Sequence, residues 1–240
     1  MLFRSLLGWH RPATGRVLVE DRPLDDQHLA WLRQVTTWVD PALQLWNRSL
    51  LDNVCCGVAD GPALRVAQAM TQADLRRVLD QLPDGLQTLL GEGGGLVSGG
   101  EGQRVRFGRA LARPGVRLVI LDEPFRGLDR AQRRALLQRA RQVWRTATLV
   151  CITHDVGATQ AFERVWVMEG GRIVEDGAPA TLAAEPETRY RALVDAEAAV
   201  HKELWAQGIW RRLRLVEGRV CEEGRPSPAP DDARNCKGGA

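Results

Sequence analysis

The chain has 240 residues, of which 44% are hydrophobic and 26% are charged, and its formal net charge is +3. This length and composition are typical of a globular domain that can bury a full core, and they exclude collagen-like and low-complexity classes. No apolar run is longer than four residues, which excludes a membrane-spanning helix of about 20 residues, and the short apolar N-terminus is not a secretory signal.

Charge and cysteine usage narrow the classes of partner and compartment. The basic residues are almost all arginine, since only Lys202 and Lys237 are lysines, and acidic residues nearly balance them. We therefore expect no nucleic acid partner. The five cysteines are odd in number and lack metal-ligand spacing, which indicates unpaired thiols in a reducing compartment.

The first part of the chain predicts short elements separated by turns. Residues 2–7 resemble the end of a helix, and residues 16–20 a short strand. Residues 27–47 have a mixed pattern, with a strand-like stretch at 35–39. From 49 to 91 the apolar spacing becomes helical, interrupted by Gly-Pro and Pro-Asp-Gly turns.

The middle of the chain predicts alternating helices and strands. Ser98 is a natural N-cap for a helix that ends near residue 112. Two short apolar runs, 116–121 and 146–152, flank a second helix at 131–145. This order predicts an α/β domain with a mostly parallel sheet. The second helix has an apolar stripe of Leu136, Leu137, Ala140, Val143 and Trp144, and its arginines are expected to form a solvated face.

The last part predicts a hairpin, a helix and a tail. Residues 165–175 form two strand-like runs around a Glu-Gly-Gly turn. A helix that contains Trp205 and Trp210 is expected after about Asp195. From about residue 222 the composition predicts disorder.

One candidate site lies where the apolar run 118–121 ends in Asp122 and Glu123. The carboxyl edge of a parallel sheet is where α/β proteins bind ligands. Asp122 can hold Mg²⁺ through water there, and Glu123 can polarise an attacking water. The alternative is a strand that ends in a solvated acidic turn.

Three further positions carry candidate chemistry. Ser98, Gly99 and Gly100 start a helix whose N–H groups suit a phosphate, although an ordinary N-cap has the same pattern. His154 follows the second apolar run and can contact a phosphate oxygen, although a structural hydrogen bond is the alternative. Asp129 follows a Gly-Leu turn and is either a functional residue or only the N-cap of the next helix.

In chain order, these parts resemble the ATP-binding cassette (ABC) ATPase family. Residues 98–101 are similar to its signature motif, residues 118–123 to its Walker B strand, residues 127–129 to its D-loop, and His154 to its switch histidine. The likeness extends over about residues 2–195. The glycine-rich stretch just before the signature looks most like the exporter branch.

The resemblance implies an ABC-type P-loop NTPase fold of the α/β class, incomplete at its N-terminus. Residues 1–48 would be a remnant of the ATPase core with the Q-loop region, and residues 49–112 a helical subdomain that ends in the signature helix. Residues 113–195 would be the core with Walker B, D-loop and switch histidine. A C-terminal extension at 196–220 and a disordered tail at 221–240 would follow.

The resemblance also implies function. The chain would be the ATP-binding subunit or domain of an exporter-like ABC transporter that uses ATP and Mg²⁺. It would hydrolyse ATP in a head-to-tail dimer with a second cassette, on the cytoplasmic face of the inner or plasma membrane, attached through transmembrane domains. Glu123 and His154 would be catalytic, and Asp122 would support Mg²⁺. The residues expected to contact nucleotide are Ser98, Gly99, Gly100, Glu101, Gln44 and Asp129.

The sequence departs from the family pattern in four places. It lacks the phosphate-binding loop Gly-x-x-x-x-Gly-Lys-Ser/Thr, which the resemblance would put just before Met1. Val39 aligns best with the Q-loop glutamine, and Gln44 is the nearest candidate. Glu101 replaces the signature glutamine and is expected to face solvent or Arg104. The D-loop has Arg-Gly where Ser-Ala is usual.

These departures keep an alternative open. The chain would then be a catalytically incompetent cassette that supplies only its signature face to a complete partner, as a regulatory subunit. ABC ATPases of DNA repair are a third class, but they resemble cassettes split by long coiled coils, and no heptad segment interrupts this chain.

Overall fold

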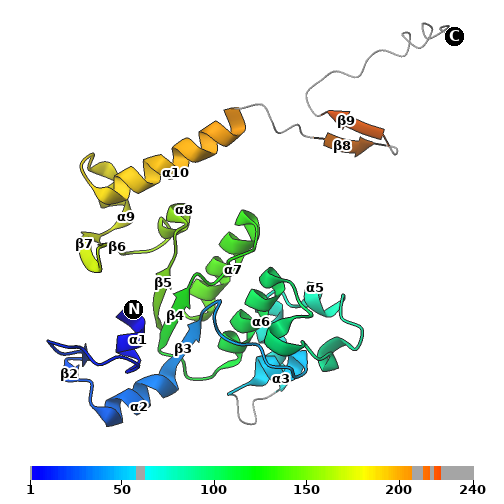
Figure 1. The fold of residues 1–240 in the computed structure, drawn as a ribbon, viewed down its shortest axis with the longest axis horizontal. Helices are drawn as coiled ribbons and strands as arrows, with labels where there is room; N and C mark the ends of the chain where they lie inside the picture. Colours follow the sequence, from blue (N-terminus) through cyan, green and yellow to red (C-terminus); the bar gives the residue numbers. More distant parts are fainter. Residues whose placement is uncertain (1, 58–62, 207–212, 217–218, 223–240) are drawn as a thin grey trace, which may run out of the picture. The chain divides into compact units, whose positions relative to one another are not determined.

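The computed structural model describes residues 2–57, 63–206, 213–216 and 219–222 (Figure 1). The chain divides into two compact units, Met1–Ala158 and Thr159–Ala240. Within the described ranges, no helix combines the length and the hydrophobicity that crossing a bilayer requires.

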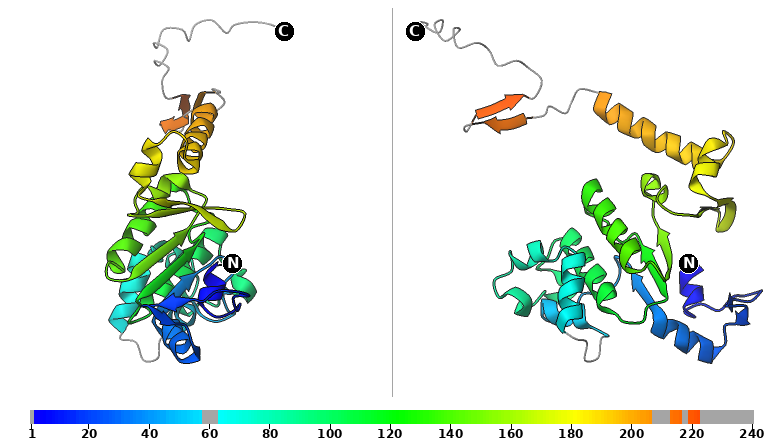
Figure 2. Two further views of the ribbon diagram at one scale, coloured as in Figure 1. Left: turned by 90° about the vertical axis from the view of Figure 1, so that its left-hand side faces the viewer. Right: turned by 180° about the vertical axis from the view of Figure 1, so that it is seen from behind.

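A parallel sheet forms the centre of the first unit. Its strands are β3 (Thr36–Val39), β4 (Leu118–Asp122) and β5 (Thr148–Ile152), in the order β3-β4-β5 (Figures 1 and 2). Both pairings are parallel, with Thr36 opposite Leu118 and Leu118 opposite Thr148. The two strands predicted from apolar runs and the strand-like stretch at 35–39 are therefore confirmed, and the carboxyl ends of all three meet at one edge.

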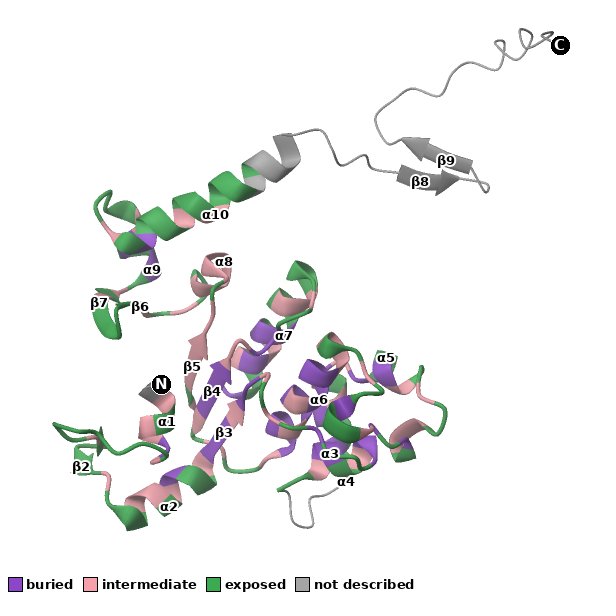
Figure 3. Cartoon of the chain, in the orientation of Figure 1, coloured by how far each residue is buried: buried purple, intermediate pink, exposed green. Residues whose placement is uncertain are grey.

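Burial is greatest in the central strand. The side chains of Val119, Ile120 and Leu121 in β4 are fully buried (Figure 3). In β5, residues 149–152 are only partly buried. Because a parallel sheet is normally covered on both faces, the difference marks β5 as the less protected side of the sheet.

The exposure of β5 leads to a prediction about association. β5 pairs with β4 alone in the described part of the chain, and an uncovered edge is a template for further strands. We expect the purified 240-residue chain to self-associate, with an apparent mass in light scattering that rises with concentration. Thr148→Lys, on the exposed start of β5, is expected to lower this association, whereas Thr146→Lys, exposed just outside the strand, is not. A monodisperse monomer at high concentration contradicts the prediction.

Helices flank the sheet strands in sequence. α1 (Leu2–Leu6) precedes a short antiparallel hairpin, in which β1 (Leu18–Val19) and β2 (Arg22–Pro23) have two residues each. α2 (Asp26–Val35) follows and leads directly into β3. α2 lies where the sequence showed a mixed pattern, and Asp25 caps it by accepting from the backbone N–H of His28 at 2.7 Å. α1 and the strand at 18–19 agree with the predicted positions.

α7 (Arg130–Val143) connects β4 to β5, as predicted, and α8 (Val156–Thr159) follows β5. Leu136, Leu137 and Ala140 of the expected stripe are buried, as is Trp144. Val143 is an exception, because its side chain is 42% exposed. The predicted stripe was therefore one residue too wide, since Val143 falls at the end of the last turn.

A helical region lies between β3 and β4 in sequence, as the helical spacing of residues 49–91 predicted. Its helices are α3 (Leu50–Cys55), α4 (Ala63–Gln72), α5 (Arg76–Leu79) and α6 (Gly99–Ala112), with short 3-10 helices at η1 (Gly85–Gln87) and η2 (Glu92–Gly94). α6 packs against α3 and α4. Val105, Gly108 and Ala112 of α6 are buried.

Aromatic side chains connect α6 to the region around α7. Phe107 of α6 is fully buried. Its ring meets Phe125 edge-on at 5.3 Å between centroids, and Trp144 in the same way at 5.8 Å. Such pairs add to the free energy gained by burial alone. The helix that begins at Ser98 is thereby fixed to the segment that follows β4.

The second unit contains the predicted hairpin, formed by β6 (Val165–Glu169) and β7 (Arg172–Gly177), which pair antiparallel. Next come α9 (Pro179–Ala184), α10 (Arg189–Ala206) and a second antiparallel hairpin of β8 (Leu213–Val216) and β9 (Arg219–Glu222). The helix expected after Asp195 thus begins earlier, at Arg189, where the Glu175 carboxylate accepts from the backbone N–H groups of Arg189 and Tyr190. Residues 221 and 222 of the tail predicted to be disordered belong to β9. Trp210 and residues 223–240 lie outside the described residues.

Candidate functional site

Three carboxylates gather where the parallel strands end. Asp122 is the last residue of β4, Glu123 follows it, and Asp40 follows β3. Burial raises the pKa of Asp122, and the neighbouring charges of Asp40 and Glu123 raise it further. Asp40 was not among the predicted site residues, although its position directly after the strand-like stretch at 35–39 is equivalent to that of Asp122 at the end of β4.

This carboxylate group fits a magnesium ion. Mg²⁺ is usually held by one or two carboxylates together with water and substrate phosphates. The repulsion that raises the pKa of Asp122 is what a cation would relieve. Among the residues that the structure describes, no group of three or more His, Cys, Asp or Glu side chains, these three carboxylates included, could hold a metal ion without further ligands. The donor set therefore suits an ion that takes most of its ligands from water and phosphate.

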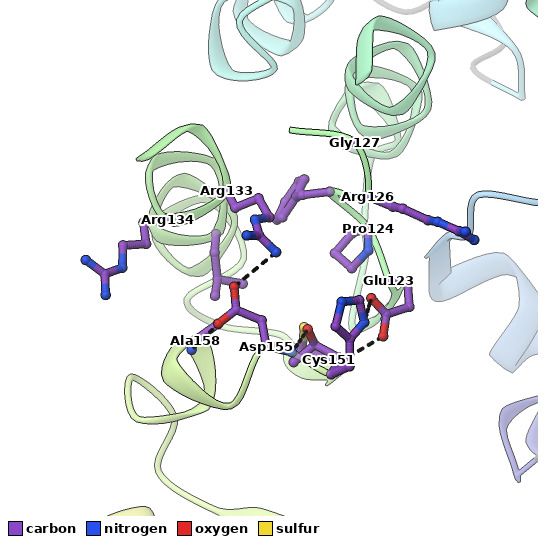
Figure 4. Close-up of a pocket in the computed structure, with 13 residues that line it drawn as sticks. Glu123, Pro124, Arg126, Gly127, Arg133, Arg134, Cys151, Asp155 and Ala158 are labelled. Atoms are coloured by element: carbon purple, nitrogen blue, oxygen red, sulfur yellow. Dashed lines mark hydrogen bonds and ion pairs between the residues drawn. The ribbon is translucent and has the colours of Figure 1, made fainter. Parts of the chain in front are cut away.

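Glu123 and His154 hold each other in a close pair. His154 Nδ1 lies 2.8 Å from Glu123 Oε2, and the His154 backbone N–H donates to Glu123 Oε1 at 2.9 Å (Figure 4). Because a carboxylate only accepts, Nδ1 carries the proton. The His154 ring is 75% exposed, so it remains accessible to a ligand.

The backbone of Glu123 is unusual. Its φ is +43°, in the left-handed region that side chains other than glycine seldom adopt. Its N–H donates to the Ile152 oxygen of β5 at 3.0 Å. The chain therefore turns sharply at the end of β4 and directs the carboxylate toward the loop that follows β5.

A cavity of about 100 Å³ lies beside this pair, lined in part by Glu123, Gly127, Cys151, His154 and Asp155. Sites for whole drug-sized ligands are roughly 300–1,000 Å³, so this one suits water molecules or a single phosphate group. Burial, followed by the nearby carboxylates, raises the pKa of Cys151 to about 12. The thiol is therefore neutral near pH 7 and is not a nucleophile.

The signature segment forms a second cluster. Ser98 Oγ accepts from the Glu101 backbone N–H at 3.3 Å, and Glu101 Oε2 accepts from the Ser98 backbone N–H at 2.7 Å, a reciprocal capping box. Glu101 thus contacts its own helix start at an exposed position and not Arg104, which was one of the two surroundings considered for it. Arg104 instead approaches Asp74 at 3.5 Å.

The signature start packs against the D-loop segment. A Cβ on Gly100 would lie 2.7 Å from Leu128 Cδ2 and 3.1 Å from the Gly127 oxygen, so only glycine fits there. Gly127 has a φ of +84°, which glycine adopts readily. Asp129 is the N-cap of α7, with Oδ1 accepting from the Gln132 N–H at 2.8 Å.

The structure therefore brings most of the predicted residues into two neighbouring clusters. Gly99 and Gly100, between Ser98 and Glu101, lie against the segment that leads to Asp129. Gly127 of that segment also lines the cavity of Glu123 and His154. Gln44 stands apart: its side chain is exposed, and its backbone oxygen accepts from Arg109 at 3.2 Å.

The capping box gives a testable stability effect. Ser98→Ala removes the Oγ acceptor and is expected to lower the free energy of unfolding by about 1 kcal/mol, measured by urea denaturation followed by circular dichroism. Ser98→Thr keeps the acceptor and is expected to remain within a few tenths of a kcal/mol of the parent. Equal stability of the alanine variant and the parent would contradict the role of this cap.

Comparison with known proteins identifies the family. The model of the ABC transporter family, ABC_tran, matches residues 1–126. The chain belongs to the ABC transporter family. The α/β fold is that of an ABC ATPase domain, as the resemblance implied, and such a domain implies nucleotide binding.

Several ABC proteins are similar to this chain. The ATP-dependent lipid A-core flippase of Chromohalobacter salexigens is 32% identical over 185 residues, which cover 77% of this chain and 32% of that protein. The mycobactin import ATP-binding/permease protein IrtB of Mycolicibacterium thermoresistibile is 36% identical over 173 residues, covering 72% of this chain and 30% of that protein. A solved structure of a bacterial Atm1-family ABC exporter with ATP bound aligns with a TM-score of 0.76 at 25% identity, covering 82% of this chain and 34% of that one. The chain thus spans about a third of the length of these ABC proteins.

Proposed function

We propose that this chain is the ATP-binding part of an exporter-type ABC transporter, in which ATP binding and hydrolysis drive transport across a membrane. The observation that carries the proposal is the Glu123–His154 pair, held at 2.8 Å beside Asp122 at the carboxyl edge of the parallel sheet. Family membership and the exporter-like relatives support the same function.

The chain's own residues would divide the work at this edge. Glu123, close to the cavity, would orient and polarise the attacking water, and His154 would contact the terminal phosphate. Asp122 would hold Mg²⁺ through water, and the ion would neutralise charge on the phosphates.

The signature cluster would serve a second cassette. The N–H groups of Gly99 and Gly100 lie in the first turn of α6, where they have no intrahelical acceptor and where the helix dipole favours an anion. With Ser98 they would contact the terminal phosphate of ATP held by the partner, in a head-to-tail dimer. Asp129, Glu101 and Gln44 remain predicted contacts of the nucleotide.

The proposed setting follows from the relatives. Two of them are described as a flippase and an ATP-binding/permease protein. We place this cassette on the cytoplasmic face of the inner or plasma membrane, attached through transmembrane domains. The phosphate-binding loop is not among its 240 residues, so it would be supplied by another segment or another chain.

The test compares the chain alone with a fusion in which a segment carrying the family's phosphate-binding loop precedes Leu2. We expect the fusion to bind ATP·Mg in calorimetry and to hydrolyse it, and the chain alone to do neither. Replacing the loop's lysine by alanine is the matched control. A folded fusion that neither binds nor hydrolyses ATP contradicts the proposal. Tight binding by the chain alone would show that a pocket of its own holds the triphosphate. Hydrolysis only when a complete cassette is added would favour the regulatory alternative.

A further inference from the structure

The loop that carries His154 is held from two sides. On one side, Glu123 at the end of β4 binds both the ring and the backbone of His154. On the other, the next residue, Asp155, forms an ion pair with Arg133 of α7, with Nη1 3.2 Å from Oδ2. Figure 4 shows Arg133 directed toward Asp155 across the cavity.

Asp155 is well placed to transmit a restraint to His154. Its side chain is only 13% exposed, so its ion pair is screened less than a surface pair would be. Its N–H donates to Thr153 Oγ1 at 3.0 Å, and its Oδ1 accepts from the Ala158 N–H at 3.2 Å. The carboxylate is thus fixed to its own loop, and displacing it would displace the adjacent His154.

Arg133 is equally well fixed to the other side. It lies in the first turn of α7, where its backbone N–H donates to the Asp129 oxygen at 2.9 Å. Its Nε is buried and has no hydrogen-bond partner within the described residues. Burying the Nε donor without a partner costs free energy. The contact between Nη1 and Asp155 therefore has to offset this cost and keep the guanidinium in its position.

We propose that Arg133 is a positioning residue for the Glu123–His154 pair. Through its ion pair with Asp155, Arg133 keeps the loop in the position at which His154 contacts Glu123. The same ion pair connects the Glu123–His154 pair to the D-loop segment, residues 127–129, which directly precedes α7. A movement of the D-loop segment would then be transmitted to Glu123 and His154 through the Arg133–Asp155 ion pair. The catalytic meaning of this link rests on the proposed function, whereas the link itself can be tested without nucleotide.

Histidine NMR provides a direct readout. The chain has four histidines, His10, His28, His154 and His201, so in the ¹⁵N-histidine-labelled full chain the His154 ring signal is the one that His154→Gln removes. Glu123→Gly removes the carboxylate and suits the positive φ, so it marks the signal position of the unpaired ring. We expect Arg133→Gln and Asp155→Asn each to change the chemical shift of the His154 ring by at least half of the difference between the parent and Glu123→Gly.

The charge-swapped variant Arg133→Asp/Asp155→Arg is expected to restore most of the original position, which a merely structural role would not do. Arg134→Gln is the matched control, because Arg134 is exposed and points away from Asp155 in Figure 4. It is expected to leave the signal unchanged. Circular dichroism shows which variants are folded. One folded variant, either Arg133→Gln or Asp155→Asn, is enough for the test.

The proposal is overturned if the His154 signal in folded Arg133→Gln or Asp155→Asn coincides with that of the parent while Glu123→Gly moves it. It is also overturned if the folded charge swap stays at the unpaired position. These spectra are recorded without ATP, so their outcome is separate from whether the fusion hydrolyses ATP. An inactive fusion with the expected spectra would contradict the proposed function and leave the link in place.

Discussion

Phe107→Ala is expected to lower the free energy of unfolding by about 3–5 kcal/mol, the usual cost of removing a buried phenylalanine ring. Phe107 is fully buried, and its ring contacts both Phe125 and Trp144, so the cavity left by alanine would lose two aromatic partners. Because domains of this size are stable by only about 5–15 kcal/mol, the variant should be partly unfolded at moderate urea concentrations, as followed by circular dichroism.

An exposed residue provides the control for this prediction. Leu89 is 56% exposed, and Leu89→Ala is expected to change stability by less than about 0.5 kcal/mol. A loss below about 1 kcal/mol in Phe107→Ala would show that the aromatic cluster is not part of the core. Because α6 carries the signature start, a destabilised Phe107 variant of the fusion should also lose ATP hydrolysis.

Glu123→Gln should lower ATP turnover by the phosphate-loop fusion at least about 100-fold, the lower range of what a general base contributes. The amide keeps the size of the side chain and its ability to accept from the His154 backbone N–H, but it cannot take a proton. ATP binding should remain within a few-fold of the parent, because Glu123 is not a predicted contact of the nucleotide. Steady-state phosphate release and calorimetry separate the two effects.

Glu92→Gln is the matched control, since Glu92 is an exposed carboxylate in η2. It is expected to leave turnover unchanged. If Glu123→Gln kept more than about a tenth of the parent rate, Glu123 would not act as the base, because a positioned base contributes on the order of 100-fold or more.

The parallel sheet was predictable from sequence because two of its strands, β4 and β5, are short apolar runs on either side of a helix. β3, β4 and β5 lie within the predicted runs to within two residues. The same logic identified Asp122, Glu123 and His154, because parallel strands bring their carboxyl ends to one edge whatever the packing elsewhere. The helix after Ser98 was predictable from its N-cap.

α2 was missed because it runs into the next strand without a turn. It ends at Val35 and β3 begins at Thr36, so the helical pattern and the strand-like pattern of residues 35–39 adjoin and read as one mixed stretch. Asp25 as N-cap was the available signal. The partner of Glu101 was also readable, because Ser98-x-x-Glu101 has the spacing of a capping box.

Contacts between distant segments could not be predicted. The Arg133–Asp155 pair and the packing of Gly100 on Gly127 depend on how α6, α7 and β5 are placed, and no local pattern specifies that placement. The division at residues 48, 112, 195 and 220 remains a prediction. By compactness, the chain divides between residues 158 and 159.

The left-handed backbone at Glu123 sets a local cost in stability against the position of its carboxylate. A φ of +43° costs a residue other than glycine about 1–3 kcal/mol. Glycine would remove this cost, but it would also remove both contacts with His154. The glutamate therefore combines a strained turn with a side chain that binds the His154 ring and backbone together.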